Sequence, residues 1–382
     1  MSQFFVSCPI GYETELVKEI KSFWFEMIDL DGLPTRAEFP EIEVLFGGIE
    51  FQAADHLGFQ INFFSKIASR VLLRIAKFEA RYFDQFEKAF AKVEWNKYFA
   101  TENIKLKAES HKSRINNEKN IIEAATNALT KNKFKVTSES QNSVFIRIDK
   151  DRVTISLDTS GEHLHRRGYA THRGDAPLRE TLAACMLKKL MNYTSINSDL
   201  TLVDPFTGSG TLLFEASSYR LPNLERDYSW LHFKNAPKLF QSSSWKKNYR
   251  WFESKNVAHC LGYDNDAKAI TNIEKNKEDY NKTFNQAYSD ISASLQDSRD
   301  LKLDSKNLRK NVWVVANPPY GIRMADDNAR EALENLEEQV DGIVVIHPKD
   351  WRFSFATLKQ SLSEEFSNQG LNLKLSVFTK TK

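Results

Sequence analysis

The first 160 residues alternate between short apolar runs typical of strands and longer stretches with helical periodicity. Leu16, Ile20 and Phe23 recur at helical spacing, whereas the run IKLKAE alternates apolar and polar residues as a strand does. The run EVLFGGIEF contains two strand-like halves joined by glycines, which predicts a hairpin. In order, we expect a strand at 3–8, a helix, the hairpin at 43–51, helices at 55–75 and 82–98, a strand at 104–109, a helix at 120–129 and strands at 144–148 and 153–157.

From residue 161 onward the pattern changes to strands that alternate with helices. A connector at 161–180 carries four arginines, three histidines and three glycines, and its Pro177 is well placed to open the following helix. This alternation predicts a parallel sheet with helices on both faces, in which ligands bind at the carboxyl ends of the strands. Strands are expected at 201–203, 258–263, 285–290, 312–316 and 343–347, with helices starting at Thr211 and Asp266.

The composition is that of an ordinary globular protein. With 382 residues, 41% hydrophobic and 27% charged, the chain has room for two to three domains. The longest apolar stretch, 61–76, is interrupted by three basic residues, so no membrane span is predicted. The first twenty residues lack the pattern of a secretory signal, and three widely spaced cysteines fit neither a disulfide framework nor a cysteine-ligated zinc site. We expect a cytoplasmic protein.

The net charge of +2 conceals an uneven distribution. Residues 1–60 carry 3 Lys and Arg against 11 Asp and Glu, a net charge of −8, whereas residues 61–180 carry 23 against 15, a net charge of +8. A basic middle segment suits a polyanion such as nucleic acid, although a solvated helical surface would look the same.

A glycine-rich turn follows the first strand of the second half, in LVDPFTGSGT. Glycines let the backbone approach a ligand closely, and the start of the next helix presents free N–H groups, so a nucleotide-like ligand is expected. The Lys-Ser/Thr pair of an ATP-type loop is absent after Gly210, and Leu213 stands where a dinucleotide fingerprint has Gly or Ala.

Two more predicted strands end in acids. Asp264 stands where strand-end carboxylates bind ribose hydroxyls in nucleoside-binding α/β folds, whereas Asp266 suits a helix cap. Asp290 ends the expected third strand and could accept a bond from an adenine amino group, or be a surface turn residue.

The run Asn317-Pro318-Pro319-Tyr320 follows an apolar strand. Two prolines fix the backbone and donate no N–H, so the Asn317 side-chain oxygen and the Pro318 carbonyl can act together as acceptors. Tyr320 can stack on a planar ring. This arrangement suits the exocyclic amine of an unpaired base, whose nitrogen it would aim at an electrophile without a metal or a covalent nucleophile.

In this order, DPFTGSGT, Asp264 and NPPY resemble the class I S-adenosylmethionine methyltransferases that modify exocyclic amino groups of bases. The runs CPIGYETEL, FSKIASRVLLRIAKFEA and TISLDTSGEHLHRRGYATHRGDAPLRETLAA resemble bacterial THUMP-domain RNA methyltransferases, nearest to the 23S rRNA guanine-N2 group and its relatives labelled adenine-specific DNA methylases. The resemblance implies a ferredoxin-like domain at 1–60, a THUMP RNA-binding domain at 61–160, and a linker with a Rossmann-like methyltransferase domain at 161–382.

The same resemblance implies S-adenosylmethionine as cofactor and direct methyl transfer to a base nitrogen, with Asn317 to Tyr320 holding the base. The methionine end would be held by Asp204, Gly208 and Gly210, the ribose by Asp264 and the adenine by Asp290. The implied cofactor site comprises Pro177, Asp204, Gly208, Ser209, Gly210, Asp264 and Asp290. We expect guanine N2 of 23S rRNA as target; adenine N6 in RNA or DNA, guanine N2 of tRNA, and a non-catalytic RNA-binding assembly factor remain open.

Basic side chains of the middle segment and the connector are the expected RNA contacts: Lys105, Lys107, Lys112, Arg114, Arg166, Arg167 and Arg173, with Lys131, Lys133 and Lys135 as further candidates. Histidines 163, 165 and 172 could suggest a metal, but no carboxylate or cysteine stands at matching spacing, so none is expected.

Overall fold

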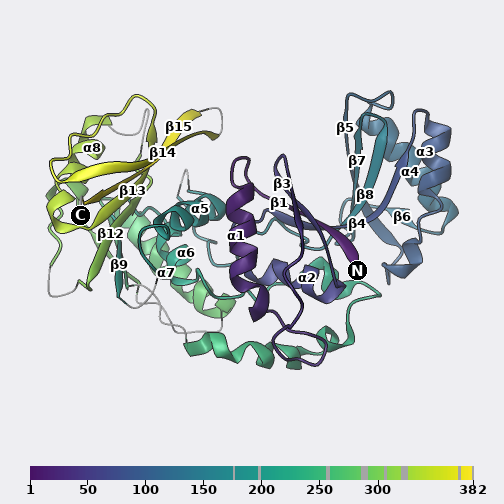
Figure 1. Cartoon of the computed structure of the whole chain (residues 1–382), viewed down its shortest axis with the longest axis horizontal. Helices are drawn as coiled ribbons and strands as arrows, with labels where there is room; N and C mark the ends of the chain where they lie inside the picture. Colours follow the sequence, from purple (N-terminus) through teal and green to yellow (C-terminus); the bar gives the residue numbers. More distant parts are fainter. Residues whose placement is uncertain are drawn as a thin grey trace. The chain divides into compact units, whose positions relative to one another are not determined.

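The computed structural model describes residues 1–174, 177–196, 199–254, 259–284, 291–304, 308–319, 326–368 and 371–380. The chain forms two compact units (Figure 1), each discontinuous in sequence. The first unit comprises Met1–Leu164 and Asp227–Arg250, and the second comprises His165–Arg226 and Trp251–Lys382. This division differs from the three domains expected from the sequence: residue 60 lies inside a helix, and 227–250 belongs with the first unit.

The first unit is built on an eight-stranded sheet with the order β2-β3-β1-β4-β8-β7-β5-β6. All neighbouring strands are antiparallel except β5, which is parallel to β6 and β7. The strands are β1 (Ser2–Ser7), β2 (Ile42–Leu45), β3 (Gly48–Ala53), β4 (Arg70–Glu79), β5 (Asn103–His111), β6 (Lys135–Val136), β7 (Ser143–Asp149) and β8 (Arg152–Asp158). The helices are α1 (Glu13–Phe23), α2 (Asp55–Phe64), α3 (Phe83–Phe90) and α4 (Glu118–Lys131).

Alternation along the strands gives this sheet one apolar and one polar face. Phe4, Leu73 and Leu157 are paired across β1, β4 and β8 and are all buried, whereas Phe5 and Arg74 belong to the opposite face. The hairpin predicted at 43–51 is confirmed, with Phe46 and Gly47 at its turn. The helix predicted at 55–75 is wrong beyond Phe64, because the chain turns there into β4.

The segment 227–250 adds aromatic side chains to the first unit. Trp230 stacks on Phe59 of α2 with ring centroids 5.0 Å apart, and Trp245 stacks on Phe63 at 5.1 Å. The segment 227–250 contains the 3-10 helices η3 (Ser229–His232) and η4 (Lys238–Gln241) and the first part of η5 (Ser243–Ser254). Elsewhere in the described residues, the 3-10 turns are η1 (Trp24–Glu26), η2 (Trp95–Lys97), η6 (Ser298–Asp300) and η8 (Glu337–Gln339).

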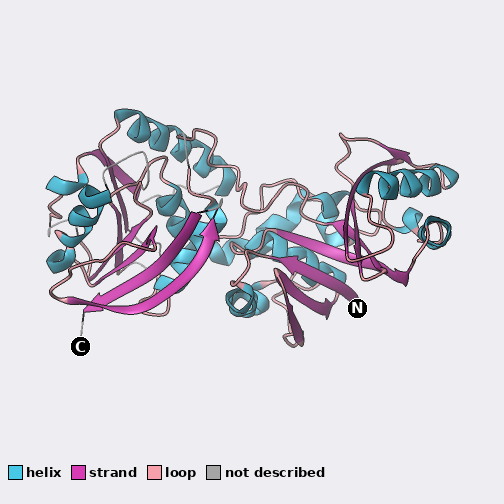
Figure 2. Cartoon of the chain, turned by 90° about the horizontal axis from the view of Figure 1, so that it is seen from above, coloured by secondary structure: helices cyan, strands magenta, loops and turns pink. Residues whose placement is uncertain are grey.

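The second unit contains a seven-stranded sheet with the order β11-β10-β9-β12-β13-β15-β14. The first five strands in this order are parallel, and β15 runs antiparallel to β13 and β14 (Figures 1 and 2). The strands are β9 (Leu200–Asp204), β10 (His259–Asp264), β11 (Ile291–Leu295), β12 (Asn311–Ala316), β13 (Gly342–Pro348), β14 (Leu358–Asn368) and β15 (Leu371–Lys380). The helices are α5 (Glu180–Leu190), α6 (Thr211–Ser217), α7 (Ala267–Phe284) and α8 (Asp326–Glu334).

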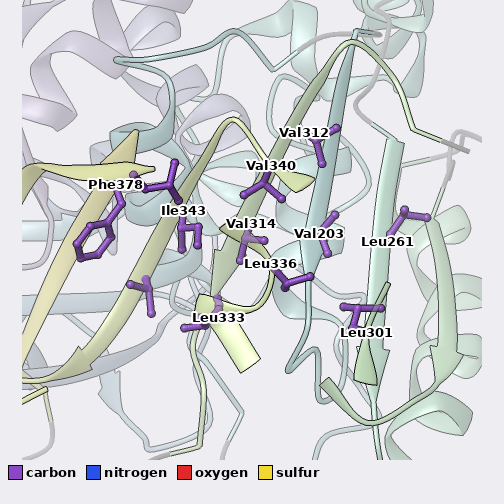
Figure 3. Close-up of a cluster of buried hydrophobic side chains, with 13 residues drawn as sticks. Val203, Leu261, Leu301, Val312, Val314, Leu333, Leu336, Val340, Ile343 and Phe378 are labelled. Atoms are coloured by element: carbon purple, nitrogen blue, oxygen red, sulfur yellow. The ribbon is translucent and has the colours of Figure 1, made fainter. Parts of the chain in front are cut away.

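One face of the parallel strands packs into a continuous core (Figure 3). Val203, Val314 and Ile343 come from adjacent strands and meet Leu333 of α8 and Leu336, which follows it. Apolar residues at successive strand positions thus fix the strands side by side, and their carboxyl ends form one edge of the sheet. This is the Rossmann-like sheet that the sequence predicts.

Candidate cofactor and target-base site

A cavity of about 1010 Å³ lies at the carboxyl ends of the parallel strands in the second unit. Its walls come from the segments that follow β9, β10, β11 and β12, and from the connector. This volume lies at the upper end of the range for ligand pockets, enough for a nucleotide-like cofactor and part of a second molecule. The sequence-predicted residues that line it are Arg173, Pro177, Asp204, Gly208, Ser209, Asp264, Asn317, Pro318 and Pro319.

The glycine loop is shaped by two residues with positive φ. Gly208 has φ 52° and donates its backbone N–H to Asp264 Oδ2 at 2.8 Å. Gly210 has φ 85° and precedes α6, where a Cβ would lie 3.0 Å from Phe214 and 3.1 Å from Ile273. Gly210 is not among the residues lining the cavity, so its contribution is to the packing beneath the loop. The space that a Cβ would occupy at Gly208 is empty, with no heavy atom within 4 Å of it. A ligand can therefore approach the backbone of Gly208 closely.

Asp204 is the most electrostatically perturbed group in the cavity. Burial raises the pKa of its carboxyl to about 8, and the nearby Asp264 adds to the effect, while a hydrogen bond from the Phe206 N–H opposes it. In the described part of the chain, no cation contributes to this pKa. A buried acid in such surroundings is suited to a positively charged ligand group. The ammonium of a methionine moiety is such a group, so Asp204 fits S-adenosylmethionine.

Among the residues that the structure describes, two buried oxygen atoms in the cavity have no hydrogen-bond partner: Asn317 Oδ1 and Thr207 Oγ1. A buried acceptor without a donor is costly unless a ligand supplies one. Asn317 follows β12 directly, and Pro318 and Pro319 line the cavity beside it. An amino group of a base is the donor that this position would accept. Tyr320 lies outside the described residues.

The third strand differs from the expectation. Asp290 lies outside the described residues, and β11, which it was expected to end, begins only after it at Ile291. The acid that follows β11 at its carboxyl end is Asp297, which lines the cavity together with Arg299. Hydrogen bonds from Arg299 lower the pKa of Asp297 below its usual value. Strand alternation in 285–295 is too weak to locate the strand from the sequence.

The three connector arginines that were predicted to contact RNA have different environments. Arg167 is only 4% exposed and pairs with Glu215, its Nε lying 3.2 Å from Oε1, so its assignment as an RNA contact is wrong. Arg166 is exposed. Arg173 lines the cavity and donates to Glu180 Oε1 at 2.6 Å and to the Ala170 carbonyl at 2.8 Å. Pro177 also lines the cavity, but α5 begins three residues later than expected.

The other predicted RNA contacts belong to the first unit. Lys105 and Lys107 lie on the polar face of β5, and the Lys107 ammonium lies 4.8 Å from the centroid of the Phe145 ring. Burial lowers the pKa of Lys107. Arg114 is exposed and donates to the Tyr82 hydroxyl at 2.8 Å, and Lys112 is an exposed residue with φ 46°. These four basic residues thus belong to the first unit, whereas the connector arginines belong to the second.

Sequence reasoning missed Asn276, a fully buried residue of α7. Its side-chain oxygen accepts the His172 N–H at 2.9 Å, and its nitrogen donates to the carbonyls of His172 at 2.9 Å and Ser209 at 3.2 Å. One side chain therefore links the connector to the glycine loop. The available signal was a polar residue on a mostly apolar stripe of this helix, which Asn276 shares with Asn272.

Within the described ranges, no group of three or more His, Cys, Asp or Glu side chains is placed to hold a metal ion. His165 lines the cavity, and His172 uses its backbone to bind Asn276. The described helices also include none that is long and apolar enough to cross a membrane.

Curated relatives match most of this chain but extend well beyond it. The ribosomal RNA large subunit methyltransferase K/L of Syntrophotalea carbinolica is 29% identical over 362 residues, covering 88% of this chain and 47% of the relative. Its namesake from Marinomonas sp. is 29% identical, covering 94% and 49%. The chain thus spans about half the length of the curated relatives it matches.

Solved structures share the fold over nearly the whole chain. A predicted N6-adenine-specific DNA methylase from Listeria monocytogenes has a TM-score of 0.75 at 20% identity, covering 98% of this chain and 95% of the other. SMU.472, a methyltransferase complexed with SAH, has a TM-score of 0.76 at 19% identity, covering 100% and 98%. TrmN from Thermus thermophilus has a TM-score of 0.70 at 14% identity, with complete coverage of both chains.

One family model covers more than half of the chain, including most of the connector, the glycine loop and the NPPY run. It is described as RMKL-like, methyltransferase domain, and it matches residues 167–372. By this match and the geometry of the cavity, the chain belongs to the RMKL-like methyltransferase domain family.

Proposed function

We propose that this chain is an S-adenosylmethionine-dependent RNA methyltransferase that modifies an exocyclic amino group, with guanine N2 of large-subunit ribosomal RNA as its target. The observation that carries the proposal is the single cavity in which the unpartnered Asn317 oxygen shares walls with Asp204 and Gly208. One side of this cavity suits a cationic nucleoside, and the other suits an amino group.

Several groups of the chain would hold the cofactor. The Asp204 carboxylate would bind the ammonium of the methionine end, and the loop backbone at Gly208 and Ser209 would lie against it. Asp264, held by the N–H groups of Gly208 and Asp266, would keep its remaining acceptor capacity for the ribose hydroxyls. We assign the adenine end to Asp297, which follows β11 and lines the cavity. The bound cofactor supplies an electrophilic methyl group on a sulfonium.

The chain's contribution to the reaction is orientation. Asn317 Oδ1 and the Pro318 carbonyl would accept the two N–H groups of the amine, which fixes the direction of the nitrogen lone pair. Pre-organisation of this kind can supply about 7–11 kcal/mol of the barrier reduction. Pro318 and Pro319 limit backbone motion at the turn, so the acceptors keep their positions.

The choice of RNA rests on the names of the curated relatives and on the charge of the chain. Both relatives above are ribosomal RNA large subunit methyltransferases. The net charge of +8 over residues 61–180 suits a polyanion, and we propose residues 61–160 within this segment as a THUMP RNA-binding domain. The Asn-Pro-Pro turn alone suits adenine as well as guanine, so adenine N6 is the alternative outcome of the experiment below.

The test is mass-spectrometric nucleoside analysis of ribosomal and transfer RNA from a strain that lacks the protein. We expect N2-methylguanosine to fall in 23S rRNA and to be restored by the purified enzyme with S-adenosylmethionine. Loss of N6-methyladenosine instead would support the alternative, and an unchanged nucleoside profile would overturn the proposal.

At the level of the site, Asn317→Ala should lower kcat about 100-fold or more, because the amine loses an oriented acceptor. Cofactor affinity, measured by calorimetry, should stay within about twofold of the native value. Asn311→Ala, at the opposite end of β12, is the matched control and should leave both quantities unchanged. Persistent turnover in Asn317→Ala would remove the role assigned to this residue.

A further inference from the structure

A second cavity, of about 580 Å³, lies within the first unit on the polar face of its sheet. Residues from six strands line it, including Phe5 on β1, Arg74 on β4 and Arg147 on β7. Strand pairing places Phe5 and Arg74 on the face opposite the buried apolar layer, so the cavity is not a packing defect of that core. Its volume falls inside the range for small-ligand and nucleotide pockets.

The floor of this cavity is a rigid planar cation. The Arg74 guanidinium lies 4.4 Å from the centroid of the Phe5 ring, donates from Nε to Glu50 at 3.1 Å and from Nη1 to Ser156 at 2.9 Å. Its side chain is only 10% exposed. Phe5, Glu50 and Ser156 already fix the Arg74 side chain. A ligand that stacks on its planar guanidinium would therefore cost this side chain little further conformational entropy.

The rim of the cavity carries an aromatic ring that packs on little else. Phe46 stands at the turn of the β2–β3 hairpin and is 81% exposed. A phenyl ring this exposed contributes little to the fold, but both of its faces are accessible for stacking. Aromatic side chains on protein surfaces are the usual stacking platforms for unpaired bases.

Basic side chains adjoin the aromatic ones. The carboxylate of Glu50 is shared by Arg74 and by Lys77, whose Nζ lies 2.9 Å from Oε1, so this trio keeps a net positive charge. Arg147 is half-exposed at the cavity and pairs at the surface with Glu109, its Nη1 lying 3.2 Å from Oε1. The lining as a whole has four basic side chains, including Arg152, against three acidic ones. On the next strand, Lys107 pairs in register with Phe145 and extends the basic surface along the same face. An aromatic platform flanked by cations fits a base with its attached phosphates better than it fits an apolar peptide.

We propose that this cavity binds an unpaired nucleotide of the RNA substrate, with the base against Phe46 and the phosphates against Lys77 and Arg147. The inference rests on the proposed function in that it takes RNA as the substrate. It adds a second contact for single-stranded RNA, in the first unit and outside the cavity that contains Asn317. The hairpin turn then has a role in recognition rather than in folding.

The experiment measures binding of a fluorescein-labelled single-stranded oligoribonucleotide to the full chain by anisotropy at low salt. We expect Phe46→Ala to weaken binding about 5- to 100-fold, from the usual contribution of base stacking, and Phe46→Trp to retain it. Phe25→Ala is the matched control, because Phe25 is also exposed, at 56%, and does not line the cavity. This control should bind within twofold of the native chain.

A separate measurement distinguishes this inference from the proposed function. Calorimetric titration with S-adenosylmethionine should give the same affinity for the native chain and Phe46→Ala, since Phe46 belongs to the first unit. Absence of cofactor binding in the native chain would overturn the proposed function and leave the RNA measurement standing. Equal oligonucleotide affinity in the native chain and Phe46→Ala, or no affinity in the native chain, would overturn the nucleotide pocket.

Discussion

Two consecutive arginines in the connector have opposite environments. Arg166 is exposed, whereas Arg167 is buried and holds Glu215 through two nitrogen atoms, at 3.2 and 3.3 Å. The Tyr169 hydroxyl donates to the same carboxylate at 2.5 Å, and burial together with Glu215 raises the pKa of Tyr169 well above its ordinary value. The carboxylate is thus held by two partners inside the second unit, and Arg167 is a structural residue.

Arg167→Ala should lower the free energy of unfolding by about 3–5 kcal/mol, because it leaves the Glu215 charge buried without its partner. Arg166→Ala is the adjacent control and should change stability by no more than about 0.5 kcal/mol. Urea unfolding of both variants measures the difference. The double variant R167M/E215L should recover much of the loss, since it removes both charges. Equal stability of the two alanine variants would contradict the buried pair.

For single residues, the sequence predicts the location in the fold where that location follows from the pattern of strands. Asp204, Asp264 and Asn317 each follow an apolar strand, so their common edge could be predicted before their contacts were known. Burial of Arg167 could not, because Glu215 lies 48 positions further along the chain. A basic residue in a polar connector looks the same whether it meets solvent or an acid from another element.

The connector lies along one face of α7 and ends at the cofactor cavity. Gly168 approaches Thr283, Thr171 donates to Asp279 at 2.5 Å, and His172 is bound by Asn276. Helix positions 276, 279 and 283 share one face at spacings of three and four residues. Because Asn276 also binds Ser209, α7 fixes the connector wall and the glycine loop relative to each other.

Asn276→Ala should weaken cofactor binding about tenfold, since two walls of the cavity lose their common anchor and buried backbone groups lose partners. Calorimetry with S-adenosylmethionine measures this directly. Thr271→Ala is the control on the same helix, because Thr271 is exposed and bonds only to the Ala267 carbonyl. If Asn276→Ala lowered the melting temperature but left the cofactor affinity of the folded protein unchanged, the role of Asn276 would be structural only. That result would disprove its positioning role.

The failed helix prediction at 65–75 has a specific physical cause. Basic residues recur at 70, 74 and 77, a helical spacing of four and three. In the structure, β4 contains an irregularity between Arg74 and Ala76. This extra residue returns Lys77 to the face of Arg74, and both side chains reach Glu50. A bulged strand therefore imitates helical periodicity, and only its cross-strand partners reveal the difference.

At the scale of the whole molecule, sequence neighbours do not always fold together. The parallel sheet of the second unit was predictable, because each strand and helix is coded by a local pattern. The assignment of 227–250 to the first unit was not, because its aromatic residues pack on α2, more than 150 positions earlier. A domain boundary drawn at residue 161 therefore cuts off part of the first unit's core.

Because 227–250 belongs to the first unit, a substitution in this segment should affect the stability of the first unit and not cofactor binding by the second. Trp230 is fully buried against Phe59, although in the sequence it lies between β9 and β10 of the second unit. Trp230→Ala should therefore lower the free energy of unfolding of the first unit by about 3–5 kcal/mol. Cofactor affinity should stay within twofold, since the cofactor cavity belongs to the second unit. Thermal unfolding with and without S-adenosylmethionine separates the two effects, because the ligand should raise only the transition of the unit that binds it. If Trp230→Ala abolished cofactor binding while the first unit kept its stability, the assignment of this segment would be wrong.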